Sequence, residues 1–298
     1  MSDAVAALEV IGLRKVYQLR ADRPGSSTPG SALLGHATSR AAPASSLVAV
    51  DDVSFCVGRG RSLAVVGESG SGKTTVARMV VGLERPSAGR VLVGGRERSW
   101  RHVNSRERRR RAREVQIVFQ DPYSSLDPRM TVRACLDEVL RLHFDWSRAQ
   151  REARVEELVE QVGLDTRQAD ALPRALSGGQ RQRVAIARAL ASEPQILICD
   201  EAVASLDVSI QAQVLNLLSD IREATGVSYL FISHDLAVVR QVSDDVVVMR
   251  QGTLVESGPT ERVLDSPEAA YTKRLLAAIP RPGWRPVHTE PTSDPSTP

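Results

Sequence analysis

The chain has 298 residues and a formal net charge of +3, and 42% of its residues are hydrophobic and 25% charged. This length can hold one large or two medium domains with a buried core, and the composition is that of a soluble globular protein. The small net charge argues neither for nor against a nucleic-acid partner.

Three cysteines, Cys56, Cys135 and Cys199, are far apart and form no C-x-x-C pair. This spacing excludes a zinc or iron–sulfur site built on paired cysteines and is typical of a reducing compartment. No apolar run is long enough to cross a bilayer. We also expect no signal peptide, because residues 1–5 lack a basic start that leads into a long apolar segment.

The first two predicted elements are an edge strand over Leu8–Tyr17 and a second strand from Val48 to Val57. Between them, Arg20–Ser46 is rich in Gly, Pro, Ser and Ala. Loops of this size without secondary structure are uncommon inside compact domains. We therefore expect a mobile surface loop over 20–46 that carries no catalytic group.

A phosphate-loop motif follows: Gly67-Glu68-Ser69-Gly70-Ser71-Gly72-Lys73-Thr74 fits G-x-x-x-x-G-K-[ST] at every fixed position. The apolar strand Ser62–Val66 leads into the motif and an amphipathic helix over Thr75–Val81 leads out of it. In this context the backbone N–H groups and the helix N-terminus attract phosphate. The Lys73 ammonium would meet the β- and γ-phosphates, and the Thr74 hydroxyl can complete a Mg²⁺ shell. A nucleoside triphosphate site is therefore predicted, rather than a glycine-rich turn with a chance lysine.

After a turn at Pro86–Gly89 and a strand over Arg90–Val93, the chain becomes strongly basic. The arginines of this run are Arg96, Arg98, Arg101, Arg106, Arg108, Arg109, Arg110, Arg111 and Arg113. Clustered arginines can neutralise nucleic-acid phosphates. We favour the simpler interpretation, a solvated helix face, because no interleaved aromatic residues or base-reading motif accompany the charge.

A short apolar strand over Val115–Phe119 ends at Gln120, and two helices follow. Thr131 is the expected N-cap of the first helix. The second helix is expected to end at Gly163. Each helix has an apolar stripe at helical spacing: Val132, Leu136, Val139 and Leu140 in the first, and Val155, Leu158, Val159 and Val162 in the second. With no strand before Ile196, this block is predicted to be an inserted helical subdomain.

The last third of the chain alternates between helices and strands. We expect a helix over Arg181–Leu190, a buried strand over Ile196–Cys199, and a helix that ends near Gly226. A strand over Ser228–Ser233 and a hairpin within Val246–Val255 follow. From Pro280 onward, Pro, Ser and Thr dominate, and we expect disorder.

Polar residues stand at the ends of four predicted buried strands: the phosphate loop, Gln120, Asp200-Glu201 and His234. The carboxyl ends of parallel strands are where α/β sheets bind ligands. A carboxylate on a strand next to the phosphate loop can hold Mg²⁺ through water, which is the expected role of Asp200. Glu201 would then act as general base on the attacking water. Taken alone, Gln120 could be an ordinary polar loop residue and His234 a strand-end cap. Coincidence does not explain well why such residues occur at the ends of four strands.

These motifs, together with Leu176-Ser177-Gly178-Gly179-Gln180, resemble the nucleotide-binding subunit of an ATP-binding cassette (ABC) transporter. The stretch Leu176–Gln180 is similar to the signature of that family. The resemblance extends to the Q-loop (Gln120), the D-loop (Ser205-Leu206-Asp207) and the switch histidine (His234), and it covers Leu8 to Pro280. It implies an α/β fold with a P-loop NTPase (RecA-like) core, an antiparallel β subdomain and an inserted α-helical subdomain. The implied ranges are a domain over 1–280 and a disordered tail over 281–298. Within the domain, the core would be 1–120 and 189–265, the helical subdomain 121–188 and a C-terminal extension 266–280.

Three stretches narrow the resemblance to ATPase subunits of bacterial oligopeptide and dipeptide importers: Gln120–Arg129, Ile232–Val239 and Tyr271–Pro280. Two departures are visible. Ala202 stands where these relatives usually have proline, and Glu268-Ala269-Ala270 stands where they usually have a His-Pro pair.

The resemblance implies that two such subunits face each other head to tail and trap ATP between the phosphate loop of one and the signature of the other. The Ser177 hydroxyl with the Gly178 and Gly179 amides, in the motif that ends at Gln180, would form the second anion cradle. The resemblance also implies that Tyr17 stacks on adenine, although a plain packed aromatic residue is the alternative. Thr75 would contact the α-phosphate, and Asp207 would contact the opposite subunit. Gln120 would sense Mg²⁺ and water.

The implied function is ATP hydrolysis coupled to import of di- or oligopeptides or a related small solute. ATP and Mg²⁺ are the implied cofactors. The implied partners are a second ATPase subunit, two transmembrane permease subunits and, indirectly, an extracytoplasmic solute-binding protein, at the cytoplasmic face of the plasma membrane. The alternative is a soluble cassette ATPase that acts on nucleic acid or ribosomes through Arg96–Arg113. It is disfavoured because this chain has one cassette and no coiled-coil or zinc insertion, so we expect no direct nucleic-acid contact.

Overall fold

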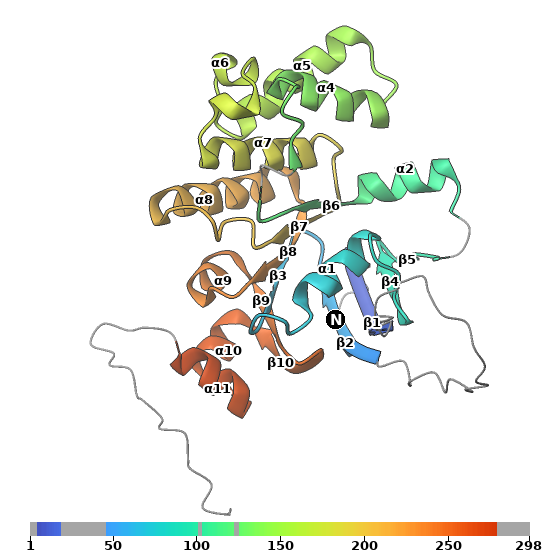
Figure 1. The fold of residues 1–298 in the computed structure, drawn as a ribbon, viewed down its shortest axis with the longest axis vertical. Helices are drawn as coiled ribbons and strands as arrows, with labels where there is room; N and C mark the ends of the chain where they lie inside the picture. The colour runs from blue at the N-terminus through green and yellow to red at the C-terminus, as the bar shows by residue number, and fades with distance from the viewer. Residues whose placement is uncertain (1–4, 19–45, 101–102, 122–124, 279–298) are drawn as a thin grey trace, which may run out of the picture.

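A computed structural model describes residues 5–18, 46–100, 103–121 and 125–278 of the protein (Figure 1). The predicted mobile loop over 20–46 lies outside these ranges except for Ser46, and so does the predicted disordered tail over 281–298.

The centre of the molecule is a six-stranded sheet with the strand order β10-β9-β3-β8-β7-β6. Four of its strands were predicted from apolar runs: β3 (Ser62–Val66), β6 (Val115–Val118), β7 (Ile196–Asp200) and β8 (Ser228–Ser233). These four strands are parallel, β9 (Asp245–Arg250) is parallel to β3, and β10 (Thr253–Pro259) closes the edge as the predicted hairpin. All residues of β3 and β7 are buried, as expected for strands covered on both faces.

The two faces of this sheet pack against different parts of the chain. On one face, Leu63, Val65 and Ile198 contact the cluster that holds α1 (Lys73–Val81) and the antiparallel sheet. On the other face, Ala64 and Leu197 belong to the cluster of α8 (Val208–Thr225), α9 (Leu236–Val242) and the helical block. The sheet therefore separates two cores, and its carboxyl edge remains open between them.

A second, antiparallel sheet has the order β2-β1-β4-β5. It consists of β1 (Leu8–Gln18), β2 (Ser46–Val57), β4 (Ala88–Val93) and β5 (Arg96–Glu97). The prediction of β1 as an edge strand is wrong, because β1 pairs with β2 on one side and with β4 on the other. Its partial alternation reflects one buried face, with Leu8, Val10 and Leu13 in the core.

The helical block between β6 and β7 contains no strand among its described residues, as predicted. It comprises α4 (Val132–His143), α5 (Arg148–Gln161), α6 (Thr166–Ala169), the 3₁₀ turn Pro173–Ala175 and α7 (Gly178–Leu190) (Figure 1). Thr131 caps α4 by accepting from the N–H of Ala134 at 3.2 Å, as predicted. The apolar stripes of α4 and α5 are buried in the same core cluster. The boundaries 121 and 188 of the subdomain stay predictions.

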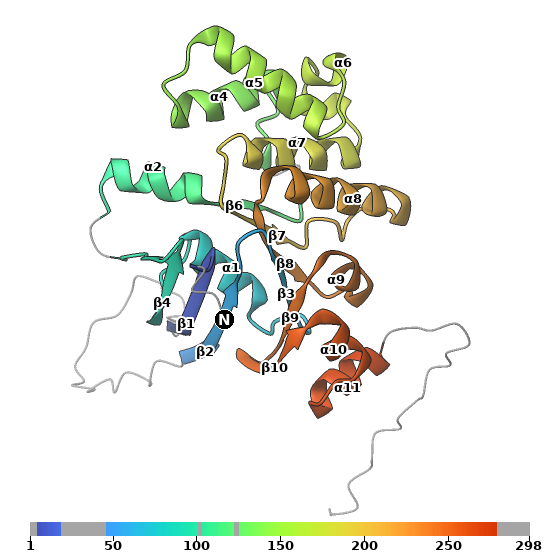
Figure 2. The ribbon, with the colours of Figure 1, turned by 180° about the vertical axis from the view of Figure 1, so that it is seen from behind.

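Three further helices complete the described fold. Helix α2 (Ser105–Glu114) carries most of the basic run and projects from the core beside the antiparallel sheet (Figure 1). Helices α10 (Thr260–Asp265) and α11 (Ala270–Ala277) follow the β9–β10 hairpin and lie at the far end of the molecule from α4 and α5 (Figure 2). No helix in these described ranges has the length and hydrophobicity needed to span a membrane.

We expect Leu136→Ala to lower the free energy of unfolding by about 2–5 kcal/mol, because Leu136 is fully buried between α4 and its neighbours and its loss leaves a cavity. Leu142→Ala, on the exposed side of the same helix, should change it by less than about 0.5 kcal/mol. Urea unfolding of both variants checks this, and equal effects would contradict the packing of the helical block.

Candidate active site

The phosphate loop, residues 67–74, connects β3 to α1 along a path that only glycine permits at two positions. Gly67 has φ +152°, and a Cβ atom there would lie 2.2 Å from the carbonyl oxygen of Met249. Gly72 has φ +101°, and its Cβ would lie 2.4 Å from the carbonyl oxygen of Ala49. Both the backbone conformation and the space therefore exclude side chains at these two positions.

The Lys73 side chain is buried and folds back over this loop. Its Nζ donates to the carbonyl oxygens of Gly67 and Glu68, both at 2.8 Å. Burial lowers the pKa of Lys73, while the negative charges of Glu201, Asp200 and Glu68 oppose that shift. The ammonium group therefore lies within the loop, as the phosphate-binding role of this residue requires.

Thr74 and Asp200 meet at the carboxyl edge of the sheet. The Thr74 hydroxyl donates to Asp200 Oδ1 at 3.2 Å. Asp200 thus lies next to the phosphate loop, as predicted, although β8 lies between β3 and β7 in the sheet. Its role as a magnesium ligand stays a prediction. Burial is the main reason that the pKa of Asp200 is raised, and the Thr74 hydrogen bond opposes it.

These two oxygen ligands fit a magnesium ion. No cluster of three or more His, Cys, Asp or Glu side chains with metal-binding geometry occurs among the described residues. A dedicated all-protein cage is thus absent from that part of the chain. Mg²⁺ is commonly bound through one or two protein groups, with substrate phosphates and waters as the other ligands. A nearby cation would also favour the ionised form of the buried Asp200 carboxylate.

Glu201 and His234 lie side by side after the neighbouring strands β7 and β8. The Glu201 N–H donates to the carbonyl of Ile232 at 2.9 Å, and Glu201 Oε1 is 3.1 Å from His234 Nδ1. Glu201 has φ +49°, an uncommon conformation for a residue with a side chain. Such backbone strain is often found at functional sites. The predicted general base and the predicted switch histidine are therefore in direct contact.

Gln120 is exposed just after β6 and joins the predicted Q-loop to the predicted D-loop. Its carbonyl oxygen accepts a hydrogen bond from Ser205 Oγ at 3.3 Å. No described hydrogen bond connects the Gln120 side chain to Thr74 or Asp200. Its roles in catalysis and in metal binding stay predictions.

The signature segment begins α7 and packs on α8. Ser177 is the N-cap: its Oγ accepts from the Gln180 N–H at 3.3 Å, and Gln180 Oε1 accepts from the Ser177 N–H at 2.8 Å. This cap starts the helix at Gly178 rather than at the predicted Arg181. A Cβ on Gly179 would lie 2.4 Å from Ile210 Cγ2, so glycine allows α7 to approach α8 closely.

No described hydrogen bond or salt bridge joins the signature, residues 177–180, to the phosphate loop of the same chain. The exposed Asp207 carboxylate caps α8 by accepting from the Ile210 N–H at 3.0 Å and from Ser209 Oγ at 2.7 Å. The described hydrogen bonds of the signature and of Asp207 are thus all local, and none brings the two predicted phosphate-binding elements of one chain together.

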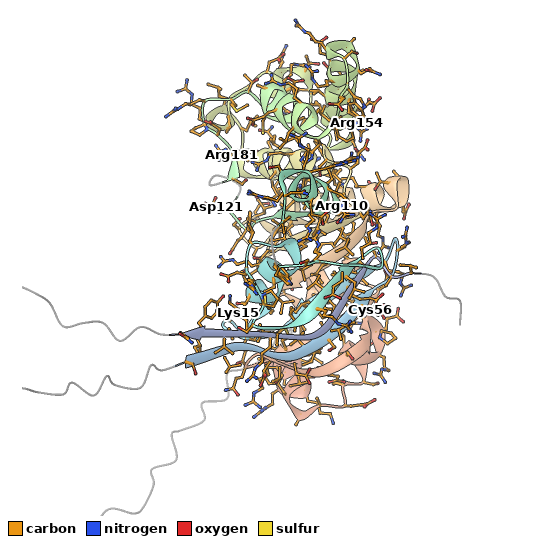
Figure 3. All side chains as sticks on the ribbon, turned by 90° about the vertical axis from the view of Figure 1, so that its right-hand side faces the viewer. Lys15, Cys56, Arg110, Asp121, Arg154 and Arg181 are labelled. Carbon is orange, nitrogen blue, oxygen red and sulfur yellow. The ribbon has the colours of Figure 1, made fainter. Side chains whose placement is uncertain are left out.

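Tyr17 is half-buried near the end of β1, opposite Leu47 of β2. The Lys15 ammonium lies over its ring, 4.8 Å from the centroid, so one ring face is covered. Figure 3 shows Lys15 on the long strands of the antiparallel sheet. Thr75 is part of α1 and partly exposed. Adenine stacking by Tyr17 and the α-phosphate contact of Thr75 stay predictions.

The sequence analysis missed a contact between the phosphate loop and the C-terminal extension. The Glu68 N–H donates to Tyr271 Oη of α11 at 3.2 Å, although 203 residues separate them. The Tyr271 ring is buried, and the Arg250 guanidinium lies over it at 5.2 Å. Lys73 binds the Glu68 carbonyl, so the Glu68 residue is held at both its N–H and its C=O group. No local pattern could reveal this contact.

Comparisons with known proteins agree with this geometry. A family model described as "ABC transporter" matches residues 50–204. A putative peptide import ATP-binding protein of Brucella abortus is 50% identical over 235 residues, which are 79% of this chain and 70% of the relative. A dipeptide transport ATP-binding protein of Escherichia coli is 44% identical (80% and 71% coverage), and an oligopeptide transport ATP-binding protein of Bacillus subtilis is 45% identical (80% and 79%).

Two solved structures share the fold at 24% identity. A dimeric bacterial ABC transporter cassette matches with a TM-score of 0.68 over 85% of this chain and 98% of that chain. The protein cbiO1 from Clostridium perfringens matches with a TM-score of 0.71 over 93% and 97%. The predicted fold class is confirmed, and the chain belongs to the ABC transporter family. Within that family it is an ATP-binding cassette that hydrolyses ATP.

We expect Tyr271→Phe to raise the KM for ATP by about 3- to 10-fold with little change in kcat, because the Glu68 N–H loses its acceptor while the ring still packs. Tyr229→Phe is the matched control: its hydroxyl is also buried and donates to the Leu218 carbonyl at 2.9 Å, away from the loop. Steady-state ATPase measurements at varied ATP check this. Equal KM values for the two variants would show that Tyr271 contributes packing alone.

Proposed function

We propose that this chain is the ATP-hydrolysing subunit of a bacterial importer for di- or oligopeptides or a related small solute. The observation that carries the proposal is the meeting of Lys73, the Thr74–Asp200 pair and the Glu201–His234 pair at one edge of one sheet. The names of the relatives as peptide, dipeptide and oligopeptide import proteins support the solute class.

We assign a magnesium ion to Thr74 and Asp200, with Gln120 as a further ligand. When bound, Mg²⁺ would neutralise charge on the β- and γ-phosphates of ATP. The Lys73 ammonium supplies the second positive group in the loop. Because Lys73 is buried, its positive charge acts on the phosphates with little screening by water. The buried Asp200 carboxylate would act on the magnesium ion instead.

Glu201 acts as the general base in this proposal. Its carboxylate accepts a proton from the water that attacks the γ-phosphate. The His234 ring, 3.1 Å away at Nδ1, fixes the orientation of that carboxylate. The strained backbone of Glu201 sets the direction in which the side chain leaves the end of β7.

The second half of the nucleotide site comes from the signature of another cassette. The start of α7 offers the Ser177 hydroxyl and the exposed Gly178 amide next to a helix N-terminus, which attracts an anion. Because this cradle makes no described contact with the phosphate loop of its own chain, the γ-phosphate that it binds would belong to a nucleotide on the partner. The two cassettes close when ATP is bound and separate after hydrolysis.

The remaining assembly is inferred from the family. Two transmembrane permease subunits would receive the motion of the cassettes, and an extracytoplasmic solute-binding protein would deliver the solute to them. This chain would then work as a peripheral subunit at the cytoplasmic face of the membrane.

We expect Glu201→Gln to retain ATP binding and to lose turnover by about 10²–10³-fold, because the amide keeps the shape of the side chain but accepts no proton. Glu261→Gln, an exposed carboxylate on α10, should leave both quantities unchanged. Steady-state ATPase assays and equilibrium nucleotide binding check this. Turnover of Glu201→Gln close to the wild-type value would remove Glu201 from the role of base.

We expect Lys73→Ala to weaken ATP binding itself by about tenfold or more, because it removes a charge-assisted contact within the loop. Lys273→Ala, which removes an exposed lysine from α11, is the matched control and should bind like the wild type. Equilibrium titration with a non-hydrolysable ATP analogue is the measurement. Unchanged affinity in Lys73→Ala would contradict the phosphate-loop assignment.

A further inference from the structure

A basic hollow of about 380 Å³ lies between β5, α2, the end of α4 and the segment before β7. Five arginines and one histidine line it, and we call it the arginine groove: Arg96, Arg106, Arg109, Arg110, Arg113 and His143. Figure 3 shows Arg110 on α2, apart from the long strands of the antiparallel sheet. The groove thus gathers positive charge from three separate elements.

The groove is at the opposite edge of the sheet from the nucleotide site. Two of its other lining residues, Glu114 and Gln195, directly precede β6 and β7, whereas Asp200 is the last residue of β7 and Glu201 follows it. A five-residue strand is about 16 Å long at about 3.3 Å per residue. A ligand in the groove would therefore occupy a different place from ATP.

Some arginines of the basic run, Arg96–Arg113, make hydrogen bonds that stabilise the fold, and others do not. Arg98 is buried rather than solvated, and it donates to the carbonyls of Val80 and Val81 at 3.1 and 3.2 Å. Arg111 binds the Ser99 carbonyl and the Glu107 carboxylate, both at 2.6 Å. These two residues attach α2 to the core, so a solvated helix face describes only part of the run.

The groove arginines are only partly compensated by acidic groups. The Arg110 guanidinium pairs with the Glu107 carboxylate at 2.7 Å, and its Nε is 3.7 Å from the Glu114 carboxylate, too far for a hydrogen bond. Arg96, Arg106 and Arg109 have no salt bridge within the part of the chain that the structure describes. The Arg113 guanidinium is 3.7 Å from the Glu193 carboxylate, which is long for a charge-assisted hydrogen bond. The described side chains therefore leave an excess of positive charge over this hollow.

Two buried nitrogen atoms on the groove wall have no hydrogen-bond partner: Arg110 Nε and His143 Nδ1. Buried polar atoms in folded proteins are nearly always paired, so such atoms point to a missing partner. Burial, and then the charges of Arg113 and Arg109, lower the pKa of His143. An anion in the groove would supply an acceptor and relieve the repulsion among the guanidinium groups.

We propose that the arginine groove binds a ligand that carries two or more phosphate groups. Guanidinium groups match phosphate oxygens with paired hydrogen bonds, and the volume falls within the usual range for small-ligand pockets. Among the described residues, the groove wall has no Phe, Tyr or Trp side chain on which bases stack, which disfavours single-stranded nucleic acid. A soluble polyphosphate and an anionic lipid headgroup share this chemistry.

The test uses the full chain with the Lys73→Ala change, so that the phosphate loop does not compete for the probe. Sodium tripolyphosphate is titrated while the His143 imidazole is followed by NMR. Binding in the groove should raise the pKa of His143, because an anion favours the imidazolium form. Arg109 and Arg113 disfavour that form, whereas the lining carboxylates Glu114 and Glu193 act in the same sense as the anion.

The double variant Arg106→Gln/Arg109→Gln should weaken tripolyphosphate binding at least tenfold. Its matched control, Arg141→Gln/Arg148→Gln, removes the same charge from two exposed positions on α4 and α5 and should bind like the parent. The proposal would be overturned if both double variants weakened tripolyphosphate binding equally, or if the His143 NMR signal did not shift. The arginines would then form only a solvated face.

A second experiment distinguishes a soluble polyphosphate from an anionic lipid headgroup as the ligand. Vesicles of cardiolipin, whose headgroup carries two phosphates, mixed with phosphatidylcholine are compared with vesicles of phosphatidylcholine alone in co-sedimentation. Retention on the anionic vesicles that is lost in Arg106→Gln/Arg109→Gln identifies a lipid headgroup, and tripolyphosphate binding without such retention identifies a soluble ligand. A single-stranded oligonucleotide that binds in the groove when tripolyphosphate does not would overturn the proposal in favour of nucleic acid.

Discussion

The structure of the catalytic site depends on the fixed backbone path of the phosphate loop. Both sheets constrain that path: the Met249 carbonyl on β9 faces Gly67, and the Ala49 carbonyl on β2 faces Gly72. The Lys73 Nζ then joins the two ends of the loop by donating to the carbonyl oxygens of Gly67 and Glu68, both at 2.8 Å. The path of the loop is therefore fixed by contacts within the chain, and such preorganisation lowers the reorganisation needed at the moment of reaction.

Strand register explains why the catalytic groups meet at this loop. In the β7–β8 pair, Asp200 is opposite Ile232, and the Glu201 N–H adds a further hydrogen bond to the Ile232 carbonyl. This contact ends β7 in a left-handed turn, so that consecutive carboxylates diverge. Asp200 reaches the hydroxyl of Thr74, and Glu201 reaches the ring of His234. One turn thus separates the proposed metal ligand Asp200 from the proposed general base Glu201.

Much of this fold could be predicted from the sequence because the signals are local. Strands β3 and β8 have their predicted bounds, Thr131 caps its helix, and Gly226 ends α8 in the left-handed conformation. The error about β1 concerns long-range pairing, because alternation along β1 cannot distinguish an edge from an interior strand. Chain order also cannot show that β8 lies between β3 and β7 in the sheet. The Tyr271–Glu68 contact joins the two ends of the domain, where no periodicity connects them.

The central claim is that the signature of this chain completes a nucleotide site on a second cassette. It is tested most directly by Ser177→Arg in the assembled transporter, with nucleotide affinity of the isolated chain measured in parallel. The account predicts that affinity stays within about twofold, because Ser177 lies away from the phosphate loop of its own chain, while ATP turnover falls at least tenfold. Full turnover in that variant would contradict the claim, because each chain would then hydrolyse ATP without its neighbour.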